Sequence, residues 1–442
     1  MNFKLTLANI QHIKELTFSI DLTRNQLMCI VGKNGVGKTT LIRAIKNFQA
    51  TDTFTKTASP YIFNETSSIK YEVDENIYDF KFNPQLQVID TKSIIPDDIK
   101  KSIYVELPIP HGGRFNEFQR LNEIDEALRE SISLDTFTEP TELIAFLSKV
   151  YRTDRFNNLK EVEIRKSKYY FILKEDKFYI REDYLSSGEF FIINVYKMIQ
   201  RKCKLIVIDE IDISLDSAAQ VKLIQELRSF CNSYQVNIVF TTHSLALMKT
   251  LDDLELHYMD MRGAVASLQT RSYNYIKSVL FGFQGWDRYI LTEDIMLKNY
   301  LLYLVEKSDV EIFFKYKIIY IGGGSQVVDL MNRNKNEEFF SSSDKVISIL
   351  DGDQKNREDG DKVLCIPFES VEKQLFYHYV KDELPVEFQS KPINGKALHE
   401  KVSKSRDNNY MSDHEIFEFL NNKKEGEVAA FTAKLINFLT PS

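Results

Sequence analysis

The segment Gly32-Lys-Asn-Gly-Val-Gly-Lys38-Thr39 restricts the fold of this chain more than any other stretch. It matches G-x-x-x-x-G-K-[ST], the spacing of a phosphate-binding loop, and lies between the apolar run 26–31 and a helix-like stretch at about 38–47. In such a loop, glycines let backbone amides curl around phosphates, and the N-terminus of the following helix attracts negative charge. We therefore predict an α/β fold with a triphosphate site here. A glycine-rich turn with a surface lysine is the alternative.

Two side chains of this loop have specific expected roles. Lys38 reaches the β and γ oxygens of the nucleotide, and Thr39 ligates Mg²⁺. The other residues expected to contact the nucleotide are Gly32, Asn34, Gly35, Gly37 and Thr40.

A second apolar run, residues 205–208, ends in the carboxylates Asp209 and Glu210. A buried parallel strand ending this way places an aspartate to complete the Mg²⁺ shell and a glutamate to polarise the attacking water. We predict these roles for Asp209 and Glu210. Acidic residues that only cap the next helix are the alternative, and it stays open for Asp212 as well.

Three further segments follow in a fixed order: Leu185-Ser-Ser-Gly-Glu189, Ser214-Leu-Asp216 and Phe240-Thr-Thr-His243-Ser244. Together with the loop and the acidic strand end, they resemble the signature, D-loop and switch histidine of the ABC-type ATPases. The usual LSGGQ signature differs here at Ser187 and Glu189. Taken alone, the first segment also fits an ordinary helix cap, and a lone histidine at a strand end is usually structural.

The resemblance covers roughly residues 1–280 and implies that ATP and Mg²⁺ bind between two copies of the chain. Ser186 of one copy then contacts the γ-phosphate held by the other, and Ser186 and His243 complete each site across and within the dimer. Gly188 and Asp216 are further expected nucleotide-binding residues. Dimer closure would depend on the γ-phosphate and end with hydrolysis. The Q-loop stays unassigned, although Gln85 and Gln87 lie at a plausible distance along the chain.

Composition excludes several classes of protein. The net charge of −7, from 57 Lys and Arg against 64 Asp and Glu, requires any nucleic-acid binding to use local patches. The four cysteines are far apart and lack CxxC spacing, which suits a reducing compartment and argues against a zinc site. Because no signal peptide and no apolar run of about 18 residues is present, we expect a cytoplasmic protein without a membrane segment.

The chain is long enough for two domains. We expect an ATPase domain at residues 1–282, with an insertion lobe at about 50–180, and a second domain at 285–442. The boundary falls near residues 282–286, where glycine and aromatic residues interrupt both patterns. The insertion lacks the sustained heptads that a long coiled coil requires.

Strand-like and helix-like segments alternate again after Asp287, and the strands end in carboxylates or glycines. In an open parallel sheet the carboxyl ends of the strands meet at one crevice. The carboxylates expected to share it are Glu293, Asp351, Asp353 and Glu372. Carboxylates gathered in this way repel each other unless a hard cation neutralises them, so we predict a Mg²⁺ or Mn²⁺ site.

This arrangement resembles the TOPRIM domain over about residues 285–385, except that Asp294 replaces the glycine that usually follows the glutamate. An ABC-type ATPase followed by a TOPRIM-like domain resembles the OLD (overcoming lysogenization defect) family nucleases and related anti-phage ATPases. The resemblance implies phosphodiester cleavage with Glu293, Asp351 and Asp353 as metal-binding residues. A degenerate TOPRIM-like or plain α/β domain with solvated acidic strand ends is the alternative.

The resulting hypothesis is an ATP-controlled, metal-dependent nuclease that acts on DNA in bacterial anti-phage defence. In this hypothesis two copies of the protein form a dimer around ATP, or a higher oligomer, and a partner protein or a nucleic acid acts as the trigger. Two alternatives remain: a sensor scaffold that recruits or restrains an effector, and a RecF-like repair ATPase, which leaves the D-x-D motif unexplained. The basic stretches 391–406 and 160–177, the latter with Tyr169, Tyr170 and Phe171, are either nucleic-acid contacts or solvated loops.

Overall fold

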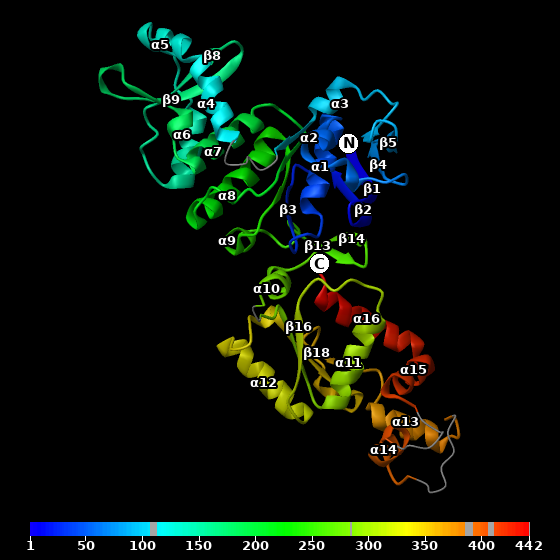
Figure 1. The fold of residues 1–442 in the computed structure, drawn as a ribbon. Coiled ribbons are helices and arrows are strands. Elements are labelled where there is room, and N and C mark those ends of the chain that lie inside the picture. The colour runs from blue at the N-terminus through cyan, green and yellow to red at the C-terminus, as the bar shows by residue number, and fades with distance from the viewer. Residues whose placement is uncertain (107–112, 283–284, 385–391, 405–410, 442) are drawn as a thin grey trace. The chain divides into compact units, whose positions relative to one another are not determined.

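The computed structural model describes residues 1–106, 113–282, 285–384, 392–404 and 411–441 (Figure 1). The chain divides into two compact units, Met1–Tyr273 and Asn274–Ser442. Both are mixed α/β, and the second contains a parallel sheet, which confirms the predicted fold class. Residues 283 and 284 of the expected boundary lie outside the described residues.

The first unit is built on an eleven-stranded sheet in the order β6-β5-β4-β1-β2-β14-β13-β3-β12-β11-β7. Its strands are β1 (Asn2–Ile10), β2 (Ile13–Asp21), β3 (Leu27–Val31), β4 (Ser68–Val73), β5 (Asn76–Asn83), β6 (Val88–Asp90), β7 (Ile103–Glu106), β11 (Leu205–Ile208), β12 (Asn237–Thr241), β13 (Leu256–Arg262) and β14 (Val265–Thr270). The five strands from β13 to β7 pair in parallel. Every residue of β3, β11 and β12 is buried, as expected for strands covered on both faces.

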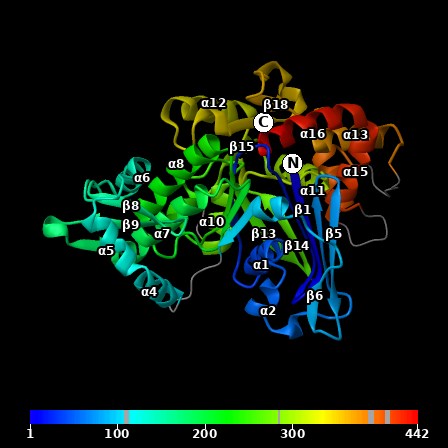
Figure 2. The same cartoon turned by 90° about the horizontal axis from the view of Figure 1, so that it is seen from above.

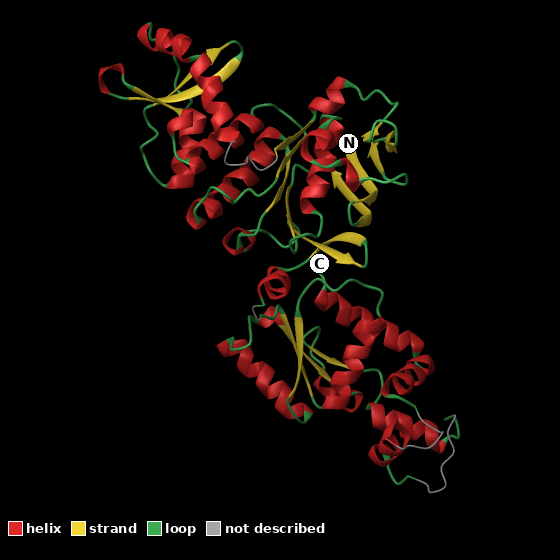
Figure 3. Cartoon of the chain, viewed as in Figure 1, coloured by secondary structure: helices red, strands yellow, loops and turns green. Residues whose placement is uncertain are grey.

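Helices connect these strands and cover the sheet (Figure 3). They are α1 (Lys38–Gln49), α2 (Thr53–Thr57), α3 (Asp97–Lys101), α7 (Ser187–Ile199), α8 (Ser217–Tyr234) and α9 (Leu245–Met248), while α10 (Tyr273–Phe281) crosses the division between the units. The core between α1 and the sheet is rich in aromatic residues, since Phe48 of α1 contacts Phe3, Tyr71 and Tyr78 of the strands.

The expected insertion lobe at about 50–180 is too long. Strands β4, β5 and β6 extend the main sheet from β1, and β7 pairs with β11 at the other end of the same sheet. A lobe with its own core begins only at α4 (Gly113–Glu123) and includes α5 (Asp125–Ser133), β8 (Leu159–Ile164), β9 (Ser167–Leu173) and β10 (Tyr179–Arg181). Helix α6 (Thr141–Tyr151), between α5 and β8 in the chain, packs instead against α7 and α8 through Phe146. Figure 2 shows β8 and β9 beside α5 and α6.

The second unit has a four-stranded parallel sheet in the order β16-β15-β17-β18. Its elements are β15 (Arg288–Thr292), α11 (Ile295–Lys307), β16 (Tyr316–Tyr320), α12 (Gly324–Glu337), β17 (Val346–Leu350), β18 (Val363–Cys365), α13 (Val371–Val380), α14 (Gly395–Lys404), α15 (Asp413–Lys423) and α16 (Glu425–Leu439). Strand β17 is buried on both sides: Val346 and Leu350 pack in the cluster of α12, and Ile347 and Ile349 in that of α11, α13 and α16. The alternation predicted after Asp287 is therefore confirmed.

All four cysteines, Cys29, Cys203, Cys231 and Cys365, are buried and none forms a disulfide. Burial raises the pKa of each thiol, to about 12 for Cys231 and Cys365. Among the helices of the described ranges, none is long and apolar enough to cross a membrane.

Candidate functional site

The phosphate-binding loop joins β3 to α1, as the sequence predicts. Gly35 and Gly37 have φ angles of +78° and +106°, which favour glycine. At Gly37, an added Cβ would lie 2.5 Å from Cδ1 of Ile13. Conformation and close packing therefore both require glycine at position 37, and α1 begins directly after it.

Lys38 lies over its own loop and is only 9% exposed. Its ammonium group donates hydrogen bonds to the carbonyl oxygens of Gly32 at 2.8 Å and Lys33 at 3.2 Å. Burial lowers the pKa of Lys38, while the negative charges of Asp209 and Glu210 raise it. The lysine therefore lies near both acidic residues, and a phosphate would offer it a charged partner in place of neutral carbonyls.

Asp209 follows β11 and is buried. Thr241, at the end of the neighbouring strand β12, donates from its hydroxyl to Oδ1 of Asp209, and the same hydroxyl oxygen accepts from the backbone N–H of Glu210 at 2.8 Å. The second oxygen of Asp209, Oδ2, is buried, and no hydrogen-bond partner is found for it within the described ranges. A buried oxygen without a partner suits a cation ligand, so Asp209 and the half-buried Thr39 fit Mg²⁺.

The predicted signature residues lie at the start of α7. Ser186 caps this helix: its hydroxyl accepts from the N–H of Glu189 at 3.3 Å, and the Glu189 carboxylate accepts from the N–H of Ser186 at 2.8 Å. In this single chain Ser186 therefore acts as an ordinary helix cap, which does not prevent contact with a nucleotide on a second copy. An added Cβ at Gly188 would lie 2.7 Å from the carbonyl oxygen of Ser214.

The remaining predicted nucleotide residues are more dispersed. Asp216 caps α8 by accepting from the N–H groups of Ala218 and Ala219, and His243 is exposed after β12. The hydroxyl of Thr40 donates to Gln11 at 2.8 Å. Gln85 and Gln87 lie in the turn after β5, near the edge of the sheet opposite β11, so the structure does not bring them to this site.

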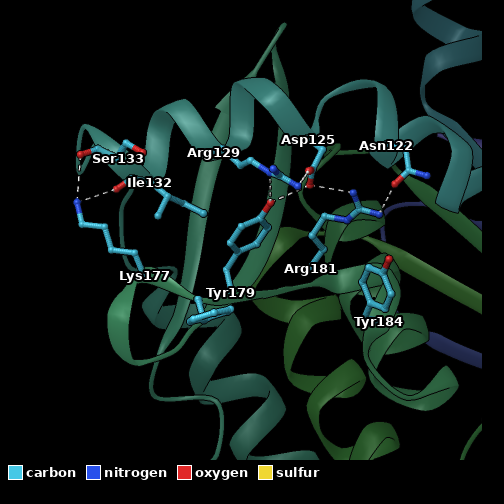
Figure 4. Close-up of a pocket in the computed structure, with 10 residues that line it drawn as sticks. Asn122, Asp125, Arg129, Ile132, Ser133, Lys177, Tyr179, Arg181 and Tyr184 are labelled. Carbon is cyan, nitrogen blue, oxygen red and sulfur yellow. Dashed lines mark hydrogen bonds and ion pairs between the residues drawn. The ribbon is translucent and has the colours of Figure 1, made fainter.

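The lobe is tied to the segment that precedes Ser186 through Arg181, which is 5% exposed (Figure 4). Its guanidinium donates to Asp183 at 2.8 and 3.1 Å, to Asp125 at 2.9 Å and to Asn122 at 2.8 Å. Tyr179 also donates to Asp125, and the group borders a hollow of about 730 Å³. Because Asp183 is only three residues from Ser186, this network fixes the approach to the signature helix.

The basic stretch 160–177 offers fewer nucleic-acid contacts than its sequence suggests. Tyr169, Tyr170 and Phe171 are buried, so of the two alternatives the structure does not support base stacking on these rings. Lys160 forms an ion pair with Glu139, Lys168 with Glu161 and Lys177 with Asp135. The aromatic rings of the stretch are therefore packed and three of its lysines are ion-paired, while Arg165, Lys166 and Lys174 are exposed.

Comparison with known proteins finds similarities to the first unit. Residues 111–249 match the family described as "AAA domain, putative AbiEii toxin, Type IV TA system". A curated relative, the phosphonates import ATP-binding protein PhnC of Lactobacillus johnsonii, is 23% identical over 243 residues, which are 54% of this chain and 78% of that protein. The first unit contains an ABC-like P-loop ATPase domain.

Solved structures similar to the chain include SMC head domains. The SMC head domain from Thermotoga maritima has a TM-score of 0.36 and 17% identity, covering 60% of this chain and 97% of that one. A second, the Smc head domain with an extended coiled coil bound to the C-terminal domain of ScpA derived from Pyrococcus furiosus, has a TM-score of 0.40 and 11% identity, covering 63% and 98%.

The family match of the ATPase domain ends before the second unit, where the predicted carboxylates lie at the ends of β15 and β17 and on α13. The backbone N–H of Asp351 donates to the carboxylate of Glu293 at 2.9 Å. Burial, followed by the charges of Glu293, Asp294, Glu372 and Asp353, raises the pKa of Asp351 to about 8. The structure therefore brings all of the predicted carboxylates into one electrostatic cluster.

Asp353 differs from the rest of this cluster. Its carboxylate accepts from Lys373 at 2.6 Å and from Gln354 at 3.1 Å. Burial raises the pKa of Asp353, but these hydrogen bonds outweigh burial and lower it. Within the described ranges, no three His, Cys, Asp or Glu side chains are close enough together to hold a metal ion. The oxygen-only donors suit Mg²⁺ or Mn²⁺, but their placement here does not form a three-ligand set.

Part of the basic segment 391–406 approaches the cluster. An added Cβ at Gly395, the first residue of α14, would lie 2.5 Å from the carbonyl oxygen of Glu372. The exposed Lys396 follows directly. Lys391 and Arg406 lie outside the described residues, so the choice between a nucleic-acid contact and a solvated loop stays open for them.

The raised pKa of Asp351 gives a pH prediction for the chain in a chelating buffer. An unfolded aspartate titrates near pH 4, so between about pH 4 and 8 the folded chain binds the extra proton and stability falls as the pH rises. The loss is at most about 5 kcal/mol. We expect the melting temperature to fall between about pH 5 and 8, and Asp351→Asn to flatten that slope. Asp329→Asn, an exposed control on α12, should keep it; equal slopes in both variants would contradict the assignment.

Proposed function

We propose that the chain is a metal-dependent nuclease that acts on DNA under the control of its ATPase domain, in bacterial defence against phage. The observation that carries the proposal is the placement of Glu293, Asp351 and Asp353 near one another, where burial and then the neighbouring carboxylates raise the pKa of Asp351 to about 8. Burial beside other carboxylates disfavours the ionised form of Asp351, and a divalent cation at the carboxyl ends of these parallel strands would neutralise its charge.

In this proposal Glu293, Asp351 and Asp353 hold the cation, with Glu372 beside them. A bound divalent cation lowers the pKa of water and offsets negative charge on the phosphate. The chain's own contribution is the positioning: the N–H of Asp351 orients Glu293 through the 2.9 Å hydrogen bond. Asp353 joins the site when its carboxylate leaves Lys373.

The proposal also assigns roles in the ATPase domain. Thr39 and Asp209 hold Mg²⁺, Lys38 binds the β and γ phosphates, and Glu210 polarises the attacking water. Ser186, Gly188 and Asp216 contact the ATP of a second copy, and His243 completes each site. Two copies thus associate when ATP is bound and separate after hydrolysis. A trigger that changes this association would thereby control the activity of the second unit.

The ion pair between Lys373 and Asp353 favours a second candidate function. A lysine that satisfies Asp353 removes one acidic residue from metal binding. In this alternative the second unit recruits or restrains a separate effector, and ATP binding changes that interaction without cleavage.

Incubation of purified protein with plasmid and with single-stranded DNA tests the two functions. We expect cleavage with Mg²⁺ or Mn²⁺, none in chelator, and a change in rate when ATP is added. RNA is tested in parallel, and cleavage of RNA alone would replace DNA as the substrate. A protein that hydrolyses ATP but cleaves nothing under any condition would support the scaffold function.

A further inference from the structure

A hollow of about 400 Å³ lies directly beside the D-x-D turn of the second unit. The glycine of that turn, Gly352, lines it, and the N–H groups of Gly352 and Asp353 donate to the carbonyl oxygens of Phe368 and Glu369 at 3.0 and 3.2 Å. An added Cβ at Gly352 would lie 2.3 Å from the Phe368 carbonyl oxygen. The wall of the hollow is thus joined rigidly to the turn that carries Asp351 and Asp353.

The charge of the hollow is opposite to that of the neighbouring carboxylates. Lys355, Lys373 and Lys424 line it against one acidic residue, Glu369. Lys355 is exposed, and Lys424 donates to the Pro367 carbonyl oxygen at 2.8 Å and pairs with Glu427 at 3.4 Å. In a chain with a net charge of −7, three lysines thus gather beside the carboxylates, and an entering phosphate would compete with Asp353 for Lys373 and with Glu427 for Lys424.

An aromatic ring completes the lining. Tyr377 on α13 is 49% exposed, and the ammonium of Lys381 lies 4.3 Å from its ring centroid. Lysines beside an exposed aromatic ring are the combination by which proteins bind a single nucleic-acid strand, with cations at the phosphates and a base on the ring. A volume of about 400 Å³ falls in the range of small-ligand pockets, so it has room for one nucleotide unit.

We infer that this hollow binds a phosphate of an unpaired nucleic-acid strand, with the adjoining base against Tyr377, and so places the next phosphodiester at the Glu293–Asp351–Asp353 cluster. The inference rests on the proposed nuclease function for its biological purpose, but the binding it describes needs no cleavage. Lys355 and Lys424 contact the phosphate. Lys373 lies between the two sites and exchanges Asp353 for the phosphate when the strand enters.

Binding of a fluorescently labelled single-stranded DNA oligonucleotide to the full chain, followed by anisotropy in chelator, tests the inference. For the wild type the logarithm of affinity falls linearly with the logarithm of salt concentration. We expect Lys355→Ala and Lys424→Ala together to reduce the steepness of that line by about 0.7, the contribution of one phosphate, and each single substitution to remove part of it and to weaken binding. Tyr377→Ala should weaken binding roughly five- to 150-fold without changing the slope, while Tyr377→Phe stays close to wild type.

Lys335→Ala, at an exposed lysine of α12 away from the hollow, is the control and should bind as the wild type does. Since Lys424 also supports the turn at Pro367, the exposed Lys355 provides the variant with less risk to folding. Wild-type affinity and slope in Lys355→Ala and Lys424→Ala would overturn the inference. So would displacement of the oligonucleotide by free deoxynucleotide at the same concentration of phosphate groups, which would indicate a mononucleotide site.

The outcome is separable from that of the nuclease proposal. Weakened binding in the variants of a protein that never cleaves DNA supports the strand site and contradicts the nuclease. If the protein cleaves DNA but these substitutions leave oligonucleotide binding unchanged, the result supports the nuclease and contradicts the strand site.

Discussion

Replacing Asp351 and Asp353 together by alanine is expected to reduce DNA cleavage by roughly 10³-fold or more while ATP hydrolysis is unchanged. The substitutions remove the two carboxylates of the D-x-D turn, and with them the charge that holds a cation. They act in a unit with its own sheet and core, so the ATPase domain provides an internal measure of folding. Nicking of supercoiled plasmid, followed on agarose gels beside phosphate release from ATP, measures both activities.

The matched control for this prediction is Asp329→Ala/Asp361→Ala, which removes two exposed carboxylates of the same unit. It should cleave as the wild type does. Equal cleavage by the D-x-D variant and the wild type would assign the activity to another site or to a contaminant. In chelator near pH 8, the D-x-D variant should also be at least as stable as the wild type, because it relieves repulsion around Asp351.

Replacing Glu210 by glutamine is expected to lower ATP hydrolysis by roughly 10²- to 10⁴-fold, the usual contribution of a general base. Glutamine keeps the shape of the side chain, and the N–H of residue 210 still donates to Thr241. ATP therefore stays bound, and the chain should remain a dimer in ATP. Lys38→Ala removes the phosphate-binding ammonium group, so it should lose nucleotide binding and stay monomeric.

Light scattering after size-exclusion chromatography, with and without ATP, separates these two variants. Lys46→Ala, a half-buried lysine at the end of α1, is the control for loss of charge on the same helix. If Glu210→Gln binds nucleotide but remains a monomer in ATP, that result would contradict the predicted contact of Ser186 and Gly188 with the ATP of a second copy.

The phosphate-binding loop and the buried strands can be predicted from the sequence, because their patterns involve only residues that are close together along the chain. The loop from Gly32 to Thr39 needs positive φ angles and close packing at glycine, and residues 205–208 form a strand because every side chain there is buried. The rule that parallel strands end at one edge agrees with the contact between Glu293 and Asp351, but within the described ranges Glu293, Asp351 and Asp353 do not form a three-ligand set, so their shared metal site stays a prediction.

The errors concern pairings between residues that are distant in sequence. The alternation of Ser68–Val73 indicates a half-buried strand but not that its partner is β1, so the pattern does not distinguish a strand of the main sheet from a strand of a separate lobe. In β9, Tyr169 to Ile172 are all buried, so neither alternation nor polarity marked the face that packs against α5. The contact of Lys373 with Asp353, and that of Thr241 with Asp209, depends on side-chain placement that no spacing rule encodes.

The burial of all four thiols has a practical consequence. Because burial also raises their pKa values, the native cysteines present little thiolate to alkylating reagents, and the wild-type chain already serves as a background for single-site labelling. Ile213, 67% exposed between Asp209 and Asp216, is a suitable place for a new cysteine. A maleimide dye on Ile213→Cys would report, by energy transfer between two labelled copies, each approach and separation of the ATPase domains in real time.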